Sequence, residues 1–240
     1  MNRAPDAALA NPLDRSRDGK IRRRPRTDET AQNTPQPIQQ TDDTPVEPTT
    51  TARSGPSACF QALLQIAEAR QVPTPEAKDS ACIIEDPVVM TQTRATFPVQ
   101  FNKKLTLDCA FALALAKFSS GTTQPLARHH LGTAIEKIHS GEGFVCRRRN
   151  NSLTGKLSEH AFGNATDWVG FTFVDGSRLA IKSTDEMAED EAAFLDSVRT
   201  AACGTFTTVL GPGSNAAHSS HFHFDLGRSK GRKNPYRICE

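Results

Sequence analysis

Residues 218–225 read HSSHFHFD, and this stretch decides how the C-terminal part of the chain can fold. If its two phenylalanines point into a hydrophobic core, the two-residue period of a β-strand places His221, His223 and Asp225 together on the opposite face. Neutral imidazole binds zinc well and titrates near pH 7. The pattern predicts a strand that carries half of an active site, although a surface strand with solvated histidines would show the same alternation.

A second stretch, SEHAFGNATD at residues 158–167, supplies another histidine and an aspartate. The Gly-Asn pair at its centre is a poor helix interior and a good turn, so we expect His160 on the turn and Asp167 at the start of a strand. His160, Asp167 and His223 would then offer two nitrogens and one oxygen to a metal ion, with water in the fourth position. This is the open arrangement of a catalytic zinc site. A capped turn with an exposed aspartate is the alternative.

Four stretches resemble, in order and approximate spacing, the extensin-like protein C-terminal domain of bacteria: CRRRN at 146–150, SEHAFGNATD at 158–167, VLGPG at 209–213 and HSSHFHFD at 218–225. The resemblance covers about residues 57–240. The two histidine motifs also resemble those of the LAS group of zinc peptidases, which includes D-Ala-D-Ala carboxypeptidases and penicillin-insensitive murein endopeptidases. Those enzymes cut peptides of bacterial cell-wall peptidoglycan.

The resemblance implies a role for each histidine. It makes His160, Asp167 and His223 the ligands of a Zn²⁺ ion. It makes His221 the catalytic group that polarises the water or steadies the oxyanion, and it suggests that His218 shares proton transfer. A histidine on an exposed loop is an equally good description of His218.

Arginines precede the serine-histidine motif, as they do in these peptidases. The resemblance makes Arg147 a substrate-binding residue, because a guanidinium suits both a carboxylate and a developing oxyanion. On a strand, Arg147 and Arg149 would share one face and Arg148 would point the other way. The three arginines could equally form a solvated patch. We expect Ser158 to cap the turn or to orient His160 through a hydrogen bond.

Composition divides the 240 residues into two parts. The first 58 contain no Phe, Trp, Tyr or Cys and hold eight of the fifteen prolines, so they cannot bury enough apolar surface to fold. We predict a disordered tail over 1–58 and a folded domain over 59–240. Seven basic residues at 15–26 could touch anionic lipid, nucleic acid or wall polymer, but a solvated tail explains them too.

The predicted domain carries 20 basic and 19 acidic residues, which argues against a dedicated nucleic-acid binder. No apolar run approaches the roughly 18 residues of a membrane span. All six cysteines lie in this domain without a Cys-x-x-Cys pair, which favours disulfides in an oxidising compartment over free cytosolic thiols. We expect Cys146 and Cys239 to anchor the ends of the site region.

The family is associated with the cell envelope, so the resemblance implies the periplasm. Residues 1–30 lack the apolar core of a signal peptide.

The hydrophobic patterns predict an α+β domain whose small antiparallel sheet carries the metal site and is flanked by helices. Helices are expected at about 57–67, 109–118, 125–138 and 189–206, the first two capped by Ser57 and Asp108. Strands are expected at 95–101, 143–146, 167–173, 178–182, 207–210 and 221–226. Trp168 would face the core. His129, His130 and His139 would lie on or just after the helix at 125–138, as surface residues.

The resemblance, together with the pattern of the metal site, implies zinc-dependent hydrolysis of peptide bonds in a peptidoglycan stem peptide or cross-link. The chain has no acidic residue where the carboxypeptidases carry their Glu-x-x-His base, which favours the endopeptidase-like branch. One alternative is a non-catalytic envelope module that keeps the fold and binds wall material. A metal-dependent nuclease or phosphatase is disfavoured by the lack of further carboxylates and by the balanced charge.

Overall fold

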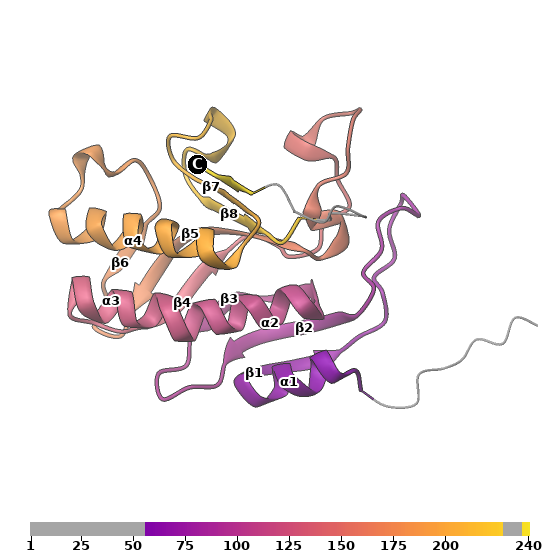
Figure 1. Ribbon diagram of the computed structural model, residues 1–240, viewed down its shortest axis with the longest axis horizontal. Coiled ribbons are helices and arrows are strands. Elements are labelled where there is room, and N and C mark those ends of the chain that lie inside the picture. Colours follow the sequence, from indigo (N-terminus) through magenta and orange to yellow (C-terminus); the bar gives the residue numbers. More distant parts are fainter. Residues whose placement is uncertain (1–55, 228–236) are drawn as a thin grey trace, which may run out of the picture. The chain divides into compact units, whose positions relative to one another are not determined.

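The computed structural model describes residues 56–227 and 237–240. All but the last three residues of the predicted tail, 1–58, therefore lie outside the described residues. The described part has the predicted α+β fold, with four α-helices and one nine-stranded sheet (Figure 1). The α-helices are α1 (Ala58–Ile66), α2 (Cys109–Phe118), α3 (Gln124–Leu131) and α4 (Glu189–Thr205). Short helical turns occur at Ser119–Thr123, Arg149–Asn151, Glu159–Phe162, Thr184–Glu186 and Ala216–His218.

The sheet is larger than expected and is mixed. Its strands are β1 (Ala67–Gln71), β2 (Pro87–Thr93), β3 (Gln100–Asp108), β4 (Ile135–Ser140), β5 (Ala165–Phe173), β6 (Arg178–Ala180), β7 (Thr208–Leu210), β8 (Phe222–Asp225) and β9 (Ile238–Cys239). Their order is β1-β2-β3-β4-β5-β8-β7-β9, and β6 also pairs with β5. The β3–β4 and β7–β9 pairs are parallel.

Two of the predicted helix caps are confirmed. The Ser57 hydroxyl accepts a hydrogen bond from the Phe60 amide at 3.1 Å and so begins α1. The Asp108 carboxylate accepts one from the Ala110 amide at 3.0 Å and begins α2. Each cap satisfies a backbone donor that the helix itself leaves unpaired, which typically contributes about 1 kcal/mol.

Helices α2, α3 and α4 lie across one face of the sheet (Figure 1). Trp168 is fully buried there, as predicted. The Phe118 ring of α2 lies 5.9 Å from the ring centroids of both Trp168 and Phe224. Because side chains alternate along a strand, the neighbours Asp167 and His223 are directed to the opposite face. The aromatic core thus fixes which side of the sheet receives the polar residues.

The helix predicted over 125–138 is wrong in its second half. Helix α3 ends at Leu131, because Gly132 adopts a left-handed conformation with φ of 67°. Such a glycine is a common helix terminator. The chain then turns into β4, which pairs with β5. His139 consequently lies on a strand, where its Nε2 is 2.7 Å from the Thr172 hydroxyl oxygen.

Other strand predictions also failed. The strand predicted at 95–101 begins only at Gln100 and continues to Asp108, and residues 143–146 form no strand. Strand β1 has the sequence AEARQ, whose residues favour helix, yet it pairs with β2, so tertiary pairing overrides local propensity. Strand β2 begins with Pro87, and a proline is tolerated at the first position of a strand.

The six cysteines form three disulfides: Cys59–Cys109, Cys82–Cys146 and Cys203–Cys239. Both expected anchors form disulfides. Cys146 links the segment before the histidine motif to Cys82, and Cys239 links β9 to Cys203 of α4. Disulfides of this kind suit an oxidising location such as the periplasm or the extracellular space. Among the described helices, none has both the length and the apolar character required to cross a membrane.

Candidate metal centre

Asp167 and His223 are direct cross-strand neighbours. The antiparallel register of β5 and β8 pairs Asp167 with His223, and His223 Nδ1 lies 2.8 Å from Asp167 Oδ1. Residues opposite each other on neighbouring strands are held at close and fixed spacing. The sheet therefore supplies a rigid carboxylate–imidazole pair from segments far apart in the sequence.

His160 joins this pair from the turn Glu159–Phe162. Ser158 begins the turn, because its hydroxyl accepts a hydrogen bond from the His160 amide at 3.4 Å, so Ser158 caps the turn rather than orienting the imidazole. Gly163 ends the turn in a left-handed conformation. The imidazole of His160 is only 1% exposed, and its Nε2 lies 3.3 Å from Asp167 Oδ2.

Backbone carbonyls set the tautomer of His160. Its Nδ1 lies 2.9 Å from the Gly143 carbonyl oxygen and 3.1 Å from that of Glu142. Since both partners can only accept, Nδ1 carries the proton and Nε2 is left with a lone pair. A Cβ added at Gly143 would lie 2.5 Å from the Thr106 carbonyl oxygen, so this close approach requires glycine.

A further carboxylate fixes His223. Its Nε2 lies 3.0 Å from Asp225 Oδ2, and Asp225 Oδ1 accepts a hydrogen bond from the Gly227 amide at 2.8 Å. Asp225 is 5% exposed. A buried carboxylate favours a proton on Nε2, which leaves Nδ1, beside Asp167, as the nitrogen that could bind a metal. The alternation of residues 221–225 had placed Asp225 on this face, but sequence reasoning gave it no role.

The three residues fit a zinc ion. The ligand atoms that His160, Asp167 and His223 offer all lie within 4.8 Å of one another. His160 Nε2 is buried and has no hydrogen-bond partner among the described residues. A buried lone pair and a carboxylate oxygen that face each other need a cation between them, either a proton or a metal. Two imidazole nitrogens and one carboxylate are a donor set that suits zinc.

Without a metal, protons supply the positive charge between these side chains. Burial alone would raise the pKa of the Asp167 carboxyl, but the nearby His160 and His223 hold it well below its ordinary value. Burial alone would likewise lower the pKa of His223, but its contacts with Asp167 and Asp225 raise that pKa to about 9. The metal-free cluster therefore keeps Asp167 charged and His223 doubly protonated at neutral pH.

His221 and His218 border the cluster. His221 Nε2 is 3.8 Å from Asp167 Oδ1, and burial lowers the pKa of His221 against the attraction of that carboxylate. The His218 ring lies 5.1 Å from the His221 ring. Asn215 Oδ1 lies 2.7 Å from His218 Nδ1, a contact that sequence reasoning missed. Burial lowers the pKa of His218 as well, with help from the neighbouring histidines.

The arginines divide between two sides, as the alternation predicted. Arg147 Nη2 lies 3.9 Å from Asp167 Oδ2. Arg147 and Arg149 line a groove of about 1260 Å³ that also contains the histidine cluster. Arg148 instead forms an ion pair with Asp79 at 3.9 Å and donates to the Gly155 carbonyl. All but one of the predicted site residues line this groove: Arg147, Ser158, Asp167, His218, His221 and His223. The exception, His160, lies behind it and contacts Asp167.

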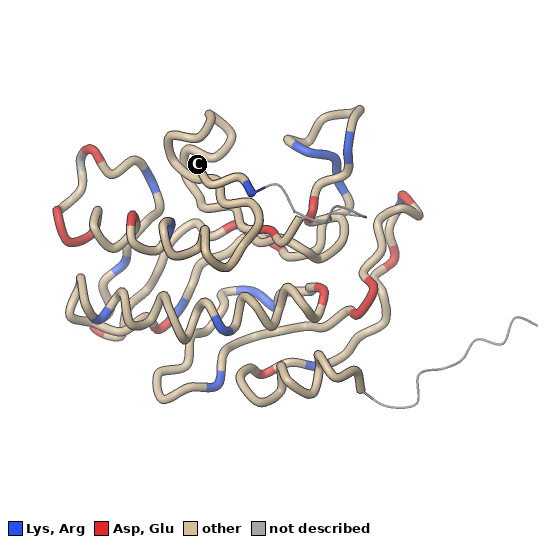
Figure 2. Tube along the Cα trace, in the orientation of Figure 1, with Lys and Arg blue, Asp and Glu red and all other residues tan. Residues whose placement is uncertain are grey.

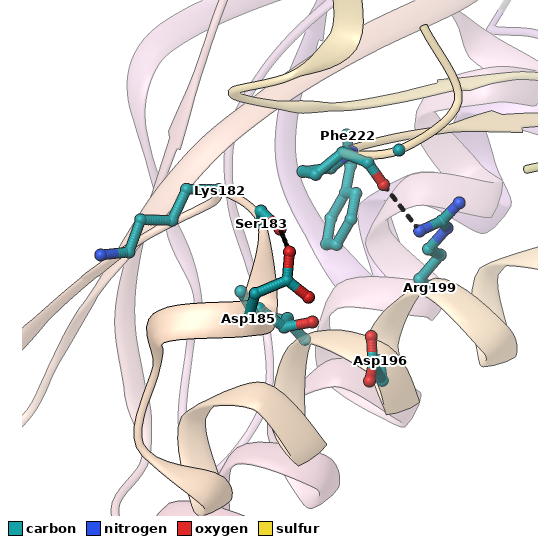
Figure 3. Close-up of a pocket in the computed structure, with 10 residues that line it drawn as sticks. Lys182, Ser183, Asp185, Asp196, Arg199 and Phe222 are labelled. Atoms are coloured by element: carbon teal, nitrogen blue, oxygen red, sulfur yellow. Dashed lines mark hydrogen bonds between the residues drawn. The ribbon is translucent and has the colours of Figure 1, made fainter.

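A second, smaller pocket of about 240 Å³ lies on the other side of β8, where Phe222 forms part of its wall (Figure 3). Within it, Arg199 donates to the Pro212 carbonyl at 3.0 Å and the Ser183 hydroxyl donates to Asp185 at 2.7 Å. None of the predicted site residues lines it. The chemistry expected from the histidine motifs therefore belongs to the larger groove.

The comparisons with known proteins give one match. Residues 57–240 match the family described as Extensin-like protein C-terminus. This match spans the whole described fold from the cap of α1 onward and includes every residue of the cluster. Neither the curated proteins nor the solved structures contain a match to the chain.

Proposed function

The chain belongs to the extensin-like C-terminal family, and we propose that it is a zinc-dependent hydrolase of peptide bonds in bacterial cell-wall peptidoglycan. The observation that carries the proposal is the convergence of two imidazole nitrogens, on His160 and His223, with the carboxylate of Asp167. The resemblance of the two motifs to those of the LAS zinc peptidases supports the choice of reaction.

In this proposal His160 Nε2, His223 Nδ1 and Asp167 hold the zinc ion. A zinc ion bound by three protein ligands supplies a Lewis acid that activates water and polarises the peptide carbonyl. Gly143 and Asp225 hold the two imidazoles in the required tautomers through the contacts described above. The protein thus contributes a preorganised ligand set on a rigid sheet.

His221 is the proposed proton-transfer group. In peptide hydrolysis the water oxygen bonds to the carbonyl carbon, the carbon–nitrogen bond breaks, and a proton must reach the departing amine. The lowered pKa of His221 keeps its imidazole neutral near pH 7, so it can accept a proton from water and later deliver it. His218 lies beside it, is only half-buried and is held by Asn215, so it can pass that proton to solvent.

Arg147 is the proposed binding group for negative charge. Its guanidinium lies on the edge of the cluster, 3.9 Å from Asp167, and has five N–H donors of which few are engaged there. A planar fork of donors matches a carboxylate or the oxyanion that develops on the carbonyl oxygen. Arg147 would therefore position the substrate over His160, Asp167 and His223.

The size of the groove favours an endopeptidase-like reaction. Its volume of about 1260 Å³ exceeds the roughly 300–1000 Å³ that is usual for a small-molecule pocket. Ile83 and Ile238 line it together with the histidine cluster. A groove of this size could hold several residues of a peptide, as cleavage within a cross-link or stem peptide requires.

The experiment is digestion of purified peptidoglycan with the zinc-loaded chain, with and without a chelator. We expect soluble muropeptides only without chelator, and none from the His221→Ala variant. Zinc binding without any release of muropeptides would refute hydrolysis and favour a non-catalytic envelope-binding module.

A further inference from the structure

Arg149 and Lys156 face each other across a projecting hairpin. The basic hairpin, residues 147–158, is held by its own backbone: the Arg149 amide donates to the Lys156 carbonyl at 3.1 Å, and the Ser158 amide donates to the Arg147 carbonyl at 3.0 Å. Arg148 and Leu157 form an antiparallel bridge between these bonds. The two cationic side chains therefore start from directly opposed backbone positions.

Both cations line the groove of the metal centre. The Arg149 side chain is 60% exposed, and its nearest carboxylate oxygen, on Glu159, is 4.0 Å away. The other oxygen of Glu159 already accepts a hydrogen bond from Asn164 at 2.9 Å. Lys156 is exposed and makes no ion pair with any residue that the structure describes. Figure 2 shows positive charge gathered on both arms of this hairpin.

Such a placement favours the binding of an anion. Like charges directly opposite each other on paired strands repel and destabilise the pair. Arg148, on the outer side of the hairpin, has its charge balanced by Asp79. On the side that faces the groove, Arg149 has only its 4.0 Å contact with Glu159 and Lys156 makes no ion pair with a described residue. The side where a ligand would lie therefore carries two closely opposed cations with a single carboxylate partner.

We propose that Arg149 and Lys156 form a carboxylate-binding subsite for an acidic peptide that lies in the groove. The proposal rests on the proposed function, and it adds that the substrate carries a free carboxylate besides the group that Arg147 would hold. A guanidinium fork and an adjacent ammonium can hold one carboxylate through charge-assisted hydrogen bonds. This subsite is distinct from Arg147, which lies against Asp167.

The test measures binding of a cross-linked muropeptide dimer, purified from peptidoglycan, to the metal-free full chain, so that cleavage does not interfere. The dimer is used with free carboxylates and after its carboxylates have been amidated. We expect Arg149→Ala and Lys156→Ala each to raise the Kd for the free dimer about three- to tenfold. We expect the amidated dimer to bind wild type as weakly as it binds the variants.

Arg148→Ala is the matched control, because it removes an equal charge from the outer side of the same hairpin. It should leave the Kd within about twofold of wild type. Thermal unfolding of each variant verifies that the hairpin variants remain folded. An unchanged Kd for Arg149→Ala and Lys156→Ala, an equal loss in Arg148→Ala, or equal binding of the free and amidated dimers would overturn the subsite.

The two proposals fail separately. If the zinc-loaded wild type cuts the dimer and the Arg149→Ala and Lys156→Ala variants have unchanged KM, the hydrolase stands and the subsite is wrong. If the binding contrasts hold but the zinc-loaded chain releases no product, the subsite stands and the hydrolase is wrong.

Discussion

His223 contacts two carboxylates at once, with Nδ1 2.8 Å from Asp167 and Nε2 3.0 Å from Asp225. Asp167 belongs to β5, whereas His223 and Asp225 belong to β8. The pairing of two strands thus creates an aspartate–histidine–aspartate chain in a nearly buried position. One carboxylate fixes the proton on the imidazole and the other shares the position where a metal would bind.

Removing a ligand should remove the metal. His223→Ala and Asp167→Ala should each abolish stoichiometric zinc binding, because two remaining ligands cannot form a tight site. His221→Ala should retain zinc and lose most turnover. Zinc content after dialysis, measured by elemental analysis, checks these outcomes. Loss of zinc in His221→Ala would mean that the ligand and the catalytic group have been exchanged.

Asp225→Asn should weaken zinc binding about 10–100-fold, as is usual for residues that orient a ligand. The single carbonyl oxygen of Asn can accept from either Gly227 or His223, and its amide can donate to His223 Nε2. That donation would move the imidazole proton to Nδ1. Competition with a chromophoric chelator measures the affinity, and ¹⁵N NMR of the imidazole identifies the tautomer. Unchanged affinity and tautomer would show that Asp225 has no orienting role.

Zinc binding should release a proton at neutral pH. The pKa of metal-free His223 is raised to about 9, above its ordinary value, so the imidazole is doubly protonated at pH 7 and must lose a proton to bind zinc. The apparent affinity should increase about tenfold per pH unit up to about pH 9 and then level off. Calorimetry in buffers of different ionisation enthalpy counts the protons. Release of none at pH 7 would contradict the assignment.

The same shift affects the stability of the metal-free protein. Because the folded pKa of His223 exceeds the unfolded value, its contribution is complete below about pH 6.5. It is lost as the pH rises through about 9. Chemical denaturation of metal-free wild type and His223→Ala at pH 6 and pH 10 should show the difference between the two proteins shrinking at the higher pH. A difference that grows with pH would have the wrong sign.

The Cys82–Cys146 disulfide should matter for both stability and metal binding. It closes a span of 64 residues, so replacing both cysteines with serine should lower the free energy of unfolding by about 4 kcal/mol. Cys146 lies shortly after Glu142 and Gly143, whose carbonyls hold the His160 imidazole. Loss of the disulfide should therefore lower the zinc affinity too. The Cys59–Cys109 disulfide, with a span of 50, is the control, since its removal should cost similar stability and leave zinc affinity unchanged. Equal zinc affinity in both variants would show that the Cys82–Cys146 disulfide does not help to hold the metal site.

Part of the site could be read from the sequence. The alternation of Phe222 and Phe224 with His221 and His223 shows which face of the strand is polar, because the phenylalanines must be buried. The structure confirms their burial. The Gly143 carbonyl that orients His160 could not be predicted, because a backbone group leaves no signal in the side-chain pattern. The contact between Asp225 and His223 depends on rotamers rather than on spacing.

The fold was predicted well where local pattern and tertiary pairing agree. Helix α4 has acidic residues in its first turn and an apolar stripe, and it lies close to where it was expected. Strands β1 and β4 were missed, because AEARQ favours helix and because the helical run before Gly132 obscured the turn into β4. Strand β9 has only two residues, and its pairing with β7 depends on contacts distant in the sequence.

The most direct measurement of the central claim is the zinc content of the full chain after metal removal, reconstitution with zinc and dialysis. If His160, Asp167 and His223 form the proposed site, elemental analysis will find about one zinc per chain in wild type. The same analysis will find none in Asp167→Ala. A wild-type protein that retains no zinc after reconstitution would contradict the metal centre and, with it, the proposed hydrolase.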